Sequence, residues 1–488
     1  MTKENNIKEM PIWLSLLPLV ALVFMLIFTI KTFGSNSLNG ATQVVLLSAS
    51  AICCIIGIVY SKVPWRNFEE SITKNIASVA SALIILLLIG ALGSSWMVSG
   101  IVPTMIYYGM EIIHPDVFLA TTCVISAIVS VMTGSSWTTI ATIGVALMGI
   151  GKAQGFAEGW VAGAIISGAY FGDKISPLSE TTVLASSICG VKLFDHIRYM
   201  LITTVPSISL AIAIFIIAGL NHQAMATEHM EMFRQAIASR FDINGWLMLV
   251  PVATGVMIAK KLPALVTLFA ASVMGVVAAL VFQPENIAEI ANGDKFAAMM
   301  QMVYGPTQLA SDNGMLAELV ATRGMSGMMT TVWLILCSMA FGAALTAGGM
   351  TDGITRLFTK IARGRISTVA STVLSGVTLN GTTSDQYISI LLTGSVFRGI
   401  YSKNKLEHRL LSRATEDSAT VTSVLIPWNS CGMVQSTVLG VATLTYLPFC
   451  FFNILSPLMS ILVATTGYKI KSEERRVKSE ESNRLYGY

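Results

Sequence analysis

Long apolar stretches alternate with short polar breaks along most of the chain. Stretches of bilayer-spanning length cover residues 11–30, 41–61, 76–98, 199–220, 262–282 and 328–349. A transmembrane helix needs about 20 apolar residues, and roughly ten to twelve candidate segments can be counted in all. The apolar runs are continuous, whereas barrel strands read as alternating runs of about ten residues. The pattern therefore predicts an all-α polytopic membrane protein.

Other apolar pieces are too short to cross a bilayer. Residues 137–151, 182–190, 366–379 and 418–428 have the length of half-helices or re-entrant arms, whereas 433–466 is long enough for two passes. Irregular backbone at membrane depth is tolerated only where protein buries it or where it lines a cavity. We therefore expect re-entrant hairpins and broken helices. Residues 283–327 form the longest polar insertion.

The two halves of the chain carry similar short motifs. Residues 97–101 resemble 350–354, residues 133–137 resemble 380–384, and residues 173–190 resemble 416–432. The offset falls from 253 through 247 to about 242–244, close to half the chain length. Duplicated halves with interrupted helices are typical of secondary transporters. We divide the chain into N-terminal helices (1–75), a first repeat (76–220), connecting helices and the polar insertion (221–327), a second repeat (328–466) and a cytoplasmic tail (467–488).

Composition supports the membrane assignment. The 488 residues are 53% hydrophobic and 12% charged, whereas a typical soluble protein is about 25% charged. The net charge of +4 forms no basic stripe, so nucleic acid is not expected as a partner. Lys62, Arg66 and Lys74 follow the second apolar segment and favour a cytoplasmic N-terminus, with residues 283–327 outside. Seven cysteines without a CxxC pair indicate neither a disulfide framework nor a metal cluster. We expect a multi-pass protein of the cell inner membrane.

Carboxylates interrupt the apolar sequence at two places. Asp173 and Glu180 lie between apolar stretches, and a carboxylate at membrane depth costs about 2.5–3.5 kcal/mol on insertion scales. Pro177 disfavours one continuous helix through Asp173 and Glu180, so a break is expected there. Pro427 is a candidate for a second break. A buried carboxylate can exchange a proton for Na⁺ by competition. The candidate ion- and proton-binding residues are Asp173 and Asp417 first, then Asp385 and Glu416, then Glu180.

Hydroxyl-rich stretches accompany these carboxylates in both halves. Sodium is a hard cation that prefers oxygen ligands, and Gly134, Gly172 and Gly381 allow the backbone to turn its carbonyls toward an ion. We place Na⁺ at Asp173, Asp417, Ser135 and Thr383. The candidate substrate-binding residues are Ser135, Ser136, Thr138, Ser176, Asn380, Thr382, Thr383, Ser384, Ser418, Thr420 and Asn429.

Structural roles are open for several of these residues. Lys174 can pair with Asp173 and hold the unwound segment, and the hydroxyl stretches can serve close helix packing. His114, His196 and His408 adjoin charged loops and are expected to be solvated. A basic cluster is assigned a topological role at a cytoplasmic loop; it contains Arg398, Lys403, Lys405, Arg409 and Arg413.

With these motifs in view, the chain resembles the NhaC-type Na⁺/H⁺ antiporter family of bacteria, which includes malate/lactate exchangers and lies within the wider ion transporter superfamily. The most specific stretches are GAYFGDKISPLSETT (168–182), NGTTSDQYISILLTGSVF (380–397) and LSRATEDSATVTSVLIPWNSCG (411–432). The resemblance implies an inverted-repeat transporter in which 133–138 and 380–385 are hairpin tips and 172–182 and 416–423 are broken-helix loops. It also implies a homodimer.

Four functions remain in competition. The leading hypothesis is exchange of Na⁺ for H⁺ by alternating access, with no cofactor beyond the transported ion. The second adds a small organic anion or amino acid, held at half-helix N-termini that favour negative charge. An intramembrane aspartyl hydrolase is disfavoured because Tyr170 stands where a GxGD motif has its first glycine, so we expect no enzyme. A passive channel would not need paired broken helices with carboxylates.

Overall fold

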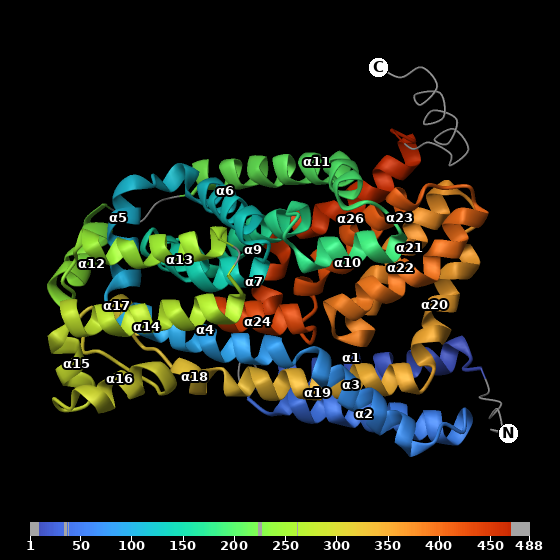
Figure 1. Cartoon of the computed structure of the whole chain (residues 1–488), viewed down its shortest axis with the longest axis horizontal. Helices are drawn as coiled ribbons and strands as arrows, with labels where there is room; N and C mark the ends of the chain where they lie inside the picture. Colours follow the sequence, from blue (N-terminus) through green and yellow to red (C-terminus); the bar gives the residue numbers. More distant parts are fainter. Residues whose placement is uncertain (1–8, 34–36, 38, 223–226, 261, 470–488) are drawn as a thin grey trace.

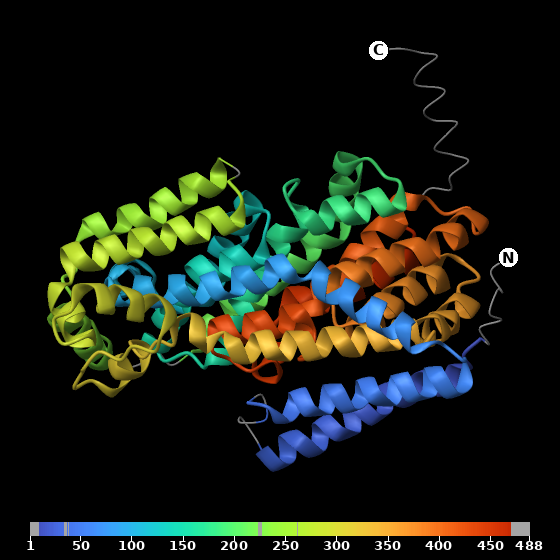
Figure 2. The ribbon, with the colours of Figure 1, turned by 60° about the horizontal axis from the view of Figure 1, so that its bottom comes forward.

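The computed structural model describes residues 9–33, 37, 39–222, 227–260 and 262–469, and their regular structure is helical. Figure 1 shows the helices lying mostly along one long axis. Three N-terminal helices come first, α1 (Ile12–Phe33), α2 (Ala41–Tyr60) and α3 (Trp65–Ser78). Figure 2 shows α1 and α2 as an outer layer, and they pack against α19 and α20. The only bridge between described extended residues joins Thr307 to Thr322, so the all-α prediction is confirmed.

Two long series of helices follow the same order. The first contains α4 (Ala80–Val98), α5 (Ile101–Ile112), α6 (Pro115–Thr133), α7 (Ser136–Thr139), the π-helix η2 (Ile140–Gly144), α8 (Val145–Ala153), α9 (Glu158–Ile175), α10 (Glu180–Cys189) and α11 (Leu193–Leu220). The second contains α19 (Met329–Ala347), α20 (Met350–Ile361), α21 (Arg365–Thr383), α22 (Gln386–Lys403), α23 (His408–Thr415), the π-helix η4 (Glu416–Thr420), the 3-10 helix η5 (Ser423–Leu425), α24 (Ser430–Leu439), α25 (Thr443–Tyr446), the 3-10 helix η6 (Leu447–Phe449) and α26 (Phe451–Thr466).

The boundaries of the two series match at a nearly constant spacing. Helices α4 and α5 start 249 residues before α19 and α20, at 80 against 329 and at 101 against 350. From α6 onward the spacing is 250. Helices α6, α9 and α10 start at residues 115, 158 and 180, and their counterparts α21, α23 and α24 start at residues 365, 408 and 430. In Figure 1, α4 leads toward α5 at one end, whereas α19 leads toward α20 at the other. We propose that these series are the two inverted repeats. The offset between them is nearly constant, so the fall from 253 to about 242–244 inferred from short motifs was wrong.

The connecting region between the repeats contains the expected helices, and its polar insertion is helical as well. It contains α12 (Thr227–Arg240), the 3-10 helix η3 (Gly245–Met248), α13 (Leu249–Ala259), α14 (Ala264–Phe282), α15 (Pro284–Ile290), α16 (Lys295–Tyr304), α17 (Gly314–Leu319) and α18 (Gly324–Gly327). Helices α12, α15 and α16 gather at one end of the long axis, opposite the end where α1 begins and α26 ends (Figure 1). This arrangement supports the prediction that the insertion and the N-terminus lie on opposite sides of the membrane.

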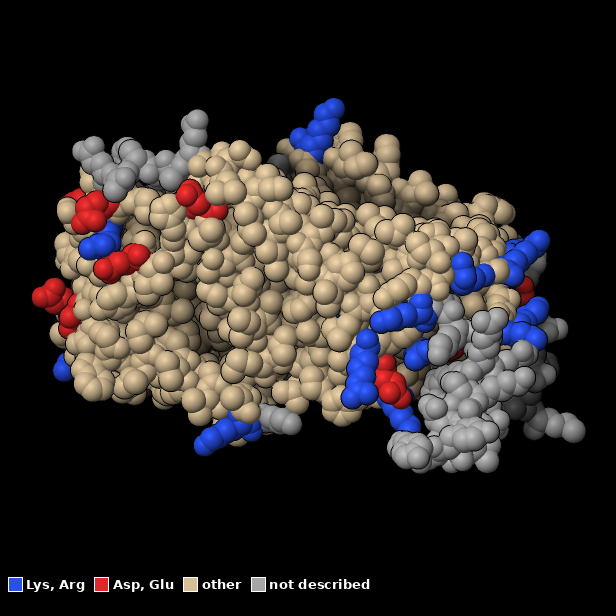
Figure 3. All heavy atoms as spheres, turned by 90° about the horizontal axis from the view of Figure 1, so that it is seen from above, with Lys and Arg blue, Asp and Glu red and all other residues tan. Residues whose placement is uncertain are grey.

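The described helices are suited to a membrane. Seven are long and apolar enough to cross a bilayer, or nine if each of two bent pairs forms one span. This is fewer than the predicted ten to twelve segments, because long helices such as α21 are rich in serine and threonine. Figure 3 shows a largely uncharged band, with acidic residues gathered toward one end and Lys and Arg mainly toward the other. Many large apolar side chains are exposed, as expected for a lipid-facing surface.

Several predicted helix boundaries were wrong. Residues 137–151 belong to a continuous helical segment from Ser136 to Ala153, and residues 366–379 belong to the 19-residue α21, so neither is a half-helix. Residues 418–428 form π and 3-10 turns rather than an α-helix. The stretch 433–466 does not cross twice, because α24 ends at Leu439 and the following helices bend by 56°. Only 182–190 matches a short helix, the 10-residue α10.

Candidate transport site

Two hairpin tips have the same local structure. Helix α6 ends at Gly134 with φ 67°, and α21 ends at Ser384 with φ 59°, the left-handed backbone region. The next residue caps the following helix in each case. The Ser135 side chain accepts from the amide of Thr138 at 3.2 Å, and the Asp385 side chain accepts from the amide of Ile388 at 2.9 Å. Both caps satisfy an amide that the helix itself leaves free.

A threonine stabilises each tip in the same way. The Thr133 hydroxyl donates to the carbonyl of Ser135 at 3.1 Å, and the Thr383 hydroxyl donates to the carbonyl of Asp385 at 3.0 Å. Residues 133–136 therefore correspond to 383–386. The predicted match between 133–137 and 380–384 was displaced by three residues. Both regions nevertheless lie at or next to helix-to-helix tips, as expected.

Two broken helices face these tips, and their breaks also correspond. Pro177 lies between α9 and α10, and Pro427 lies between η5 and α24, so both predicted breaks are confirmed. The residue before each following helix caps it. The Ser179 hydroxyl accepts from the Thr182 amide at 3.5 Å, and the Asn429 side-chain oxygen accepts from the Cys431 amide at 3.0 Å. The Asn429 side-chain amide also donates to the Asn380 carbonyl at 3.0 Å, which fixes the second break to α21 near its tip.

Asp173 is buried near the first break and is surrounded by hydrogen-bond donors. Its Oδ2 accepts from the amide and the hydroxyl of Ser136 at 3.3 Å and 2.8 Å. Its Oδ1 accepts from the hydroxyl of Ser179 at 2.6 Å, and that hydroxyl lies 2.9 Å from the hydroxyl of Thr181. Among the described residues no Lys or Arg forms an ion pair with Asp173. The carboxylate is therefore held by hydroxyls and one amide from the tip and the break.

Glycine packing brings the first tip to Asp173. A Cβ on Gly168 would lie 2.0 Å from the Cys123 carbonyl of α6, and one on Gly172 would lie 2.5 Å from the Ala127 carbonyl. Because neither residue has a side chain, α9 and α6 approach closely. Gly172 and Gly381 are helical, so their predicted role in turning carbonyls was wrong, whereas Gly134 does adopt positive φ.

Asp417 has a different environment, although it is also fully buried. Its Oδ1 accepts hydrogen bonds from Lys174 Nζ, from Thr203 at 3.0 Å and from Ser456 at 2.9 Å. The Lys174 side chain is as fully buried as Asp417 and also donates to Ser456 at 2.9 Å. The alternative in which Lys174 pairs with its neighbour Asp173 was wrong. The ion pair instead joins the first repeat to the second.

Of the other predicted polar residues, two bond within their own helical segment and two join neighbouring segments. Ser176 donates to the Val131 carbonyl at 2.8 Å and Ser418 to the Ala414 carbonyl at 2.7 Å. Thr382 donates to the Leu379 carbonyl at 3.2 Å. The Asn380 side chain donates at 2.8 Å to the Ala419 carbonyl, so it joins α21 to the π turn. Among the residues that the structure describes, no hydrogen bond of normal geometry is formed by the hydroxyls of Ser384 and Thr420.

Two carboxylates are in opposite situations. Glu416 is completely buried, and within the described residues no hydrogen bond of normal geometry reaches either carboxylate oxygen. Glu180 is exposed at the start of α10 and accepts from the Tyr387 hydroxyl at 2.9 Å. Glu180 is therefore not part of a buried cluster.

Two basic side chains were placed wrongly by the sequence analysis. Arg413 is fully buried rather than part of a solvated loop, with its Nε 3.8 Å from Oδ2 of Asp417. His196 is also buried rather than solvated, and its Nδ1 lies 2.8 Å from the Ser412 hydroxyl. Both point inward because α23 and α11 pack together. No local sequence signal distinguishes an inward arginine from the basic residues around it.

Comparison with known proteins decides the family. A model of the Na⁺/H⁺ antiporter family matches residues 6–183 and 168–468. The chain belongs to this Na⁺/H⁺ antiporter family. It is therefore a multi-pass membrane transporter and not an enzyme, as predicted.

Relatives of this antiporter-family chain differ in what their names say they transport. It is 34% identical over 426 residues to the Na⁺/H⁺ antiporter NhaC of Alkalihalophilus pseudofirmus, covering 87% of this chain and 90% of that one. It is 32% identical to the malate-2H⁺/Na⁺-lactate antiporter of Bacillus subtilis, covering 90% and 92%. It is 31% identical to the arginine/ornithine antiporter ArcD of Halobacterium salinarum, covering 96% and 94%. The chain is a secondary transporter of this family.

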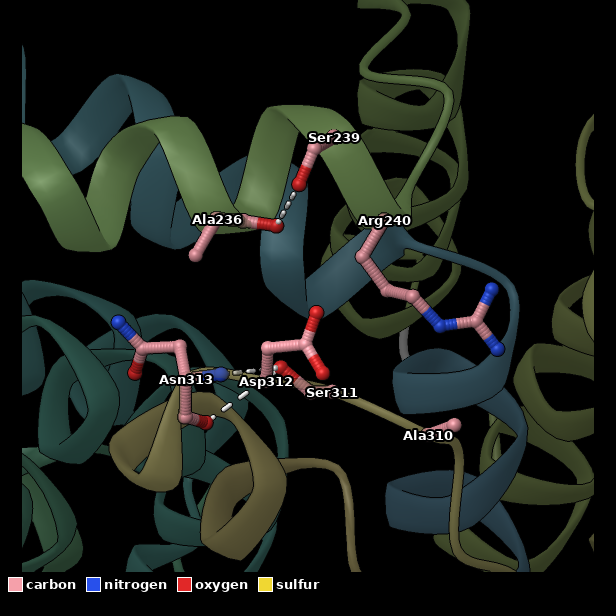
Figure 4. Close-up of a pocket in the computed structure, with 7 residues that line it drawn as sticks. All are labelled: Ala236, Ser239, Arg240, Ala310, Ser311, Asp312 and Asn313. Atoms are coloured by element: carbon pink, nitrogen blue, oxygen red, sulfur yellow. Dashed lines mark hydrogen bonds between the residues drawn. The ribbon is translucent and has the colours of Figure 1, made fainter.

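The antiporter fold does not bring the four predicted Na⁺ ligands together by hydrogen bonds. Asp173 and Asp417 belong to separate networks, and Ser135 and Thr383 bond within their own tips. Within the described part of the chain no three His, Cys, Asp or Glu residues are grouped as a metal site. A cavity of about 470 Å³ lies between α12 and residues 310–313, and its lining contains none of these carboxylates (Figure 4). Thr203 and Ser456 were missed because single hydroxyl residues on apolar helices carry no distinctive signal. Ser179 lies within the predicted broken-helix stretch 172–182 but was not chosen there as a site residue.

Proposed function

We propose that this chain exchanges Na⁺ for H⁺ by alternating access, with Asp173 as the carboxylate at which the two ions compete. The observation that carries the proposal is the buried Asp173 carboxylate, which is ringed by the hydroxyls of Ser136 and Ser179 and has no basic partner among the described residues. Such a group needs either a proton or a cation to balance its charge at membrane depth.

The chemistry around Asp173 suits both ions. A hydroxyl that donates to the carboxylate can rotate and offer its lone pairs to a cation. Asp173 together with the hydroxyls of Ser136, Ser179 and Thr181 offers the oxygen ligands that hard cations prefer. The wider Na⁺ site that includes Asp417, Ser135 and Thr383 stays a prediction, as does the homodimer.

The proposed alternation uses the division between the repeats. Asp173 and Ser136 are joined within the first repeat, where α9 packs closely on α6. Lys174 reaches Asp417 in the second repeat, so this contact would be made or broken as the repeats move against one another. Binding at Asp173 would then affect the neighbouring inter-repeat contact directly.

The proposal is tested in vesicles that contain the purified protein and a pH-sensitive dye. Addition of Na⁺ should move protons, with Li⁺ and K⁺ as selectivity controls and protein-free vesicles as blanks. Asp173→Asn should abolish the movement, whereas Asp352→Asn, a change at an exposed residue of α20, should not. Wild-type protein that takes up Na⁺ without moving protons would refute the exchange reaction.

A second candidate function is Na⁺-coupled exchange of an organic solute. It is favoured by Arg413, which is fully buried. In the part of the chain that the structure describes, its three side-chain nitrogens have no hydrogen-bond partner, although Nε lies 3.8 Å from Oδ2 of Asp417. Guanidinium groups bind carboxylates well, and two relatives carry the names of malate/lactate and arginine/ornithine antiporters. The same vesicles decide between the two functions when lactate, malate, arginine or ornithine is added. Proton movement that requires one of these solutes would favour solute exchange.

A further inference from the structure

Four exposed basic side chains lie where α20 ends and α21 begins, next to the end of α22. They are Lys360, Arg363, Arg365 and Lys403. Figure 3 shows Lys and Arg gathered mainly toward this end of the molecule, where Figure 1 places α20, α21 and α22. We call these four residues the basic corner.

Hydrogen bonds hold the segments of the basic corner side by side. The Asn404 side-chain amide donates to the carbonyl of Ala362 at 3.2 Å and lies 2.8 Å from the hydroxyl of Thr368. The end of α22 is therefore fixed to the connection between α20 and α21. The guanidinium of Arg365 also donates to the carbonyl of Thr465 near the end of α26, at 3.2 Å. Three helix ends and the start of a fourth helix thus meet at one place.

The positive charge of the basic corner is not balanced locally. The sequence contains no acidic residue in 353–384 or in 386–406. The next acidic residue on the chain, Glu407, is buried and paired with Arg409. Within the described part of the chain, no ion pair or side-chain hydrogen bond holds Arg363 or Lys403. Because like charges held close together repel, the basic corner favours an anion.

Large apolar side chains are exposed beside these charges. They are Ile361, Ile366, Leu462 and Tyr468, which are 56%, 45%, 54% and 58% exposed. In a membrane protein such side chains face lipid, and tyrosine is enriched at the membrane–water interface. A soluble phosphate would use only the charges of the basic corner. A phospholipid would use the charges and the apolar side chains together.

We propose that the basic corner binds the phosphate headgroup of an anionic phospholipid, whose acyl chains lie against Ile361 and Ile366. Guanidinium and ammonium groups bind phosphate well, and basic side chains at a membrane surface attract anionic lipids. The bound lipid braces α21, which leads to the second tip, and α26, which carries Ser456 beside Asp417. This inference goes beyond the proposed Na⁺/H⁺ exchange and does not depend on it.

The experiment measures lipid binding to the purified protein in detergent by native mass spectrometry, with phosphatidylglycerol and phosphatidylcholine as probes. Wild-type protein should bind phosphatidylglycerol more tightly than phosphatidylcholine. A basic side chain near an anionic lipid strengthens binding about 5-fold, so Arg363→Gln with Lys403→Gln should weaken phosphatidylglycerol binding about 25-fold. The matched control, Lys62→Gln with Lys74→Gln, removes two exposed charges from the N-terminal region and should bind like the wild type.

Each other outcome would overturn the proposal. Equal wild-type affinity for the two lipids would refute it without any variant, and would leave the basic residues with a topological role only. Equal losses in the two double variants would show that total charge, not the basic corner, attracts the lipid. Displacement of phosphatidylglycerol by an equal concentration of inorganic phosphate would assign the site to a soluble anion. If the first double variant does not fold, its two single variants decide, because each should lose about 5-fold.

Discussion

Asp173 and Asp417 lie on the two broken helices, yet they do not occupy equivalent positions. At the spacing of 250 residues, Asp173 corresponds to Ser423 and Asp417 corresponds to Ser167. Asp173 is held by hydroxyls and one amide, whereas Asp417 is paired with the buried Lys174. The repeat architecture therefore provides two breaks, and each break uses its carboxylate differently.

The difference shows which carboxylate is available to a mobile ion. A cation that reaches Asp417 has to displace the tethered ammonium of Lys174, whereas one that reaches Asp173 has only to reorient hydroxyls. Breaking a buried ion pair is costly because it leaves an uncompensated charge. The sequence ranked both residues first, but the structure favours Asp173 as the exchangeable site and Asp417 as a contact between repeats.

The largest effect is expected from Asp173→Asn. The amide has nearly the same shape but cannot hold a proton and a negative charge in alternation, so Na⁺-driven proton movement should disappear. The dye assay in vesicles measures this loss, and the melting temperature of the purified protein checks that folding is retained. Full activity of this variant would move the exchangeable site elsewhere.

Asp417→Asn should mainly destabilise the protein. It leaves Lys174 buried without its partner, and removing one member of a buried ion pair typically costs about 3–5 kcal/mol. Adding Lys174→Met to Asp417→Asn should recover part of the lost melting temperature, measured in detergent. If the double variant melts lower than the single variant, the pair does not contribute as the geometry indicates.

Ser136→Ala should weaken Na⁺ binding without abolishing exchange. It removes the hydroxyl 2.8 Å from Asp173 and keeps the backbone amide. Loss of a supporting group around a metal ligand typically lowers affinity 10- to 100-fold, and we expect the Na⁺ concentration for half-maximal exchange to rise about 10-fold. Ser430→Ala is a comparison change in the second repeat, where it removes a hydroxyl 3.4 Å from Asp385, and it should shift this concentration less. Equal shifts would contradict the asymmetry between the repeats.

Tyr387→Phe should have the smallest effect. It removes the hydroxyl that donates to the exposed Glu180, a contact between the repeats outside the buried cluster. A single hydrogen bond contributes about 0.5–1.5 kcal/mol, and less where water competes. The melting temperature should fall slightly while Na⁺ affinity stays unchanged. A large change in affinity would show that Glu180 belongs to the ion site after all.

Local chemistry made the breaks and one tip predictable. Pro177 and Pro427 cannot continue a hydrogen-bonded helix, and Gly134 suits a positive φ. The pair formed by Lys174 and Asp417 could not be predicted, because its members are 243 residues apart and meet only after the repeats pack. The inward position of Arg413 depends on the same packing.

The register between the repeats was missed because it was read from the wrong residues. Carboxylates and hydroxyls differ between the two copies, since each break uses them differently. Residues that shape the backbone keep the register. Gly100 and Gly349 cap α5 and α20, and Gly190 and Gly440 end α10 and α24, at spacings of 249 and 250. Aligning helix-ending residues first would have placed Asp173 opposite Ser423.

The constant spacing also constrains the history of the chain. Surface connections normally accept insertions and deletions, yet from α6 to the start of α11 the proposed copies have kept the same number of residues as from α21 to α25. This length includes the hairpin tip, the loop before the broken helix and the break itself. In two copies that diverged from one ancestor, selection would have preserved the length of these connections while their ionisable residues moved to new positions.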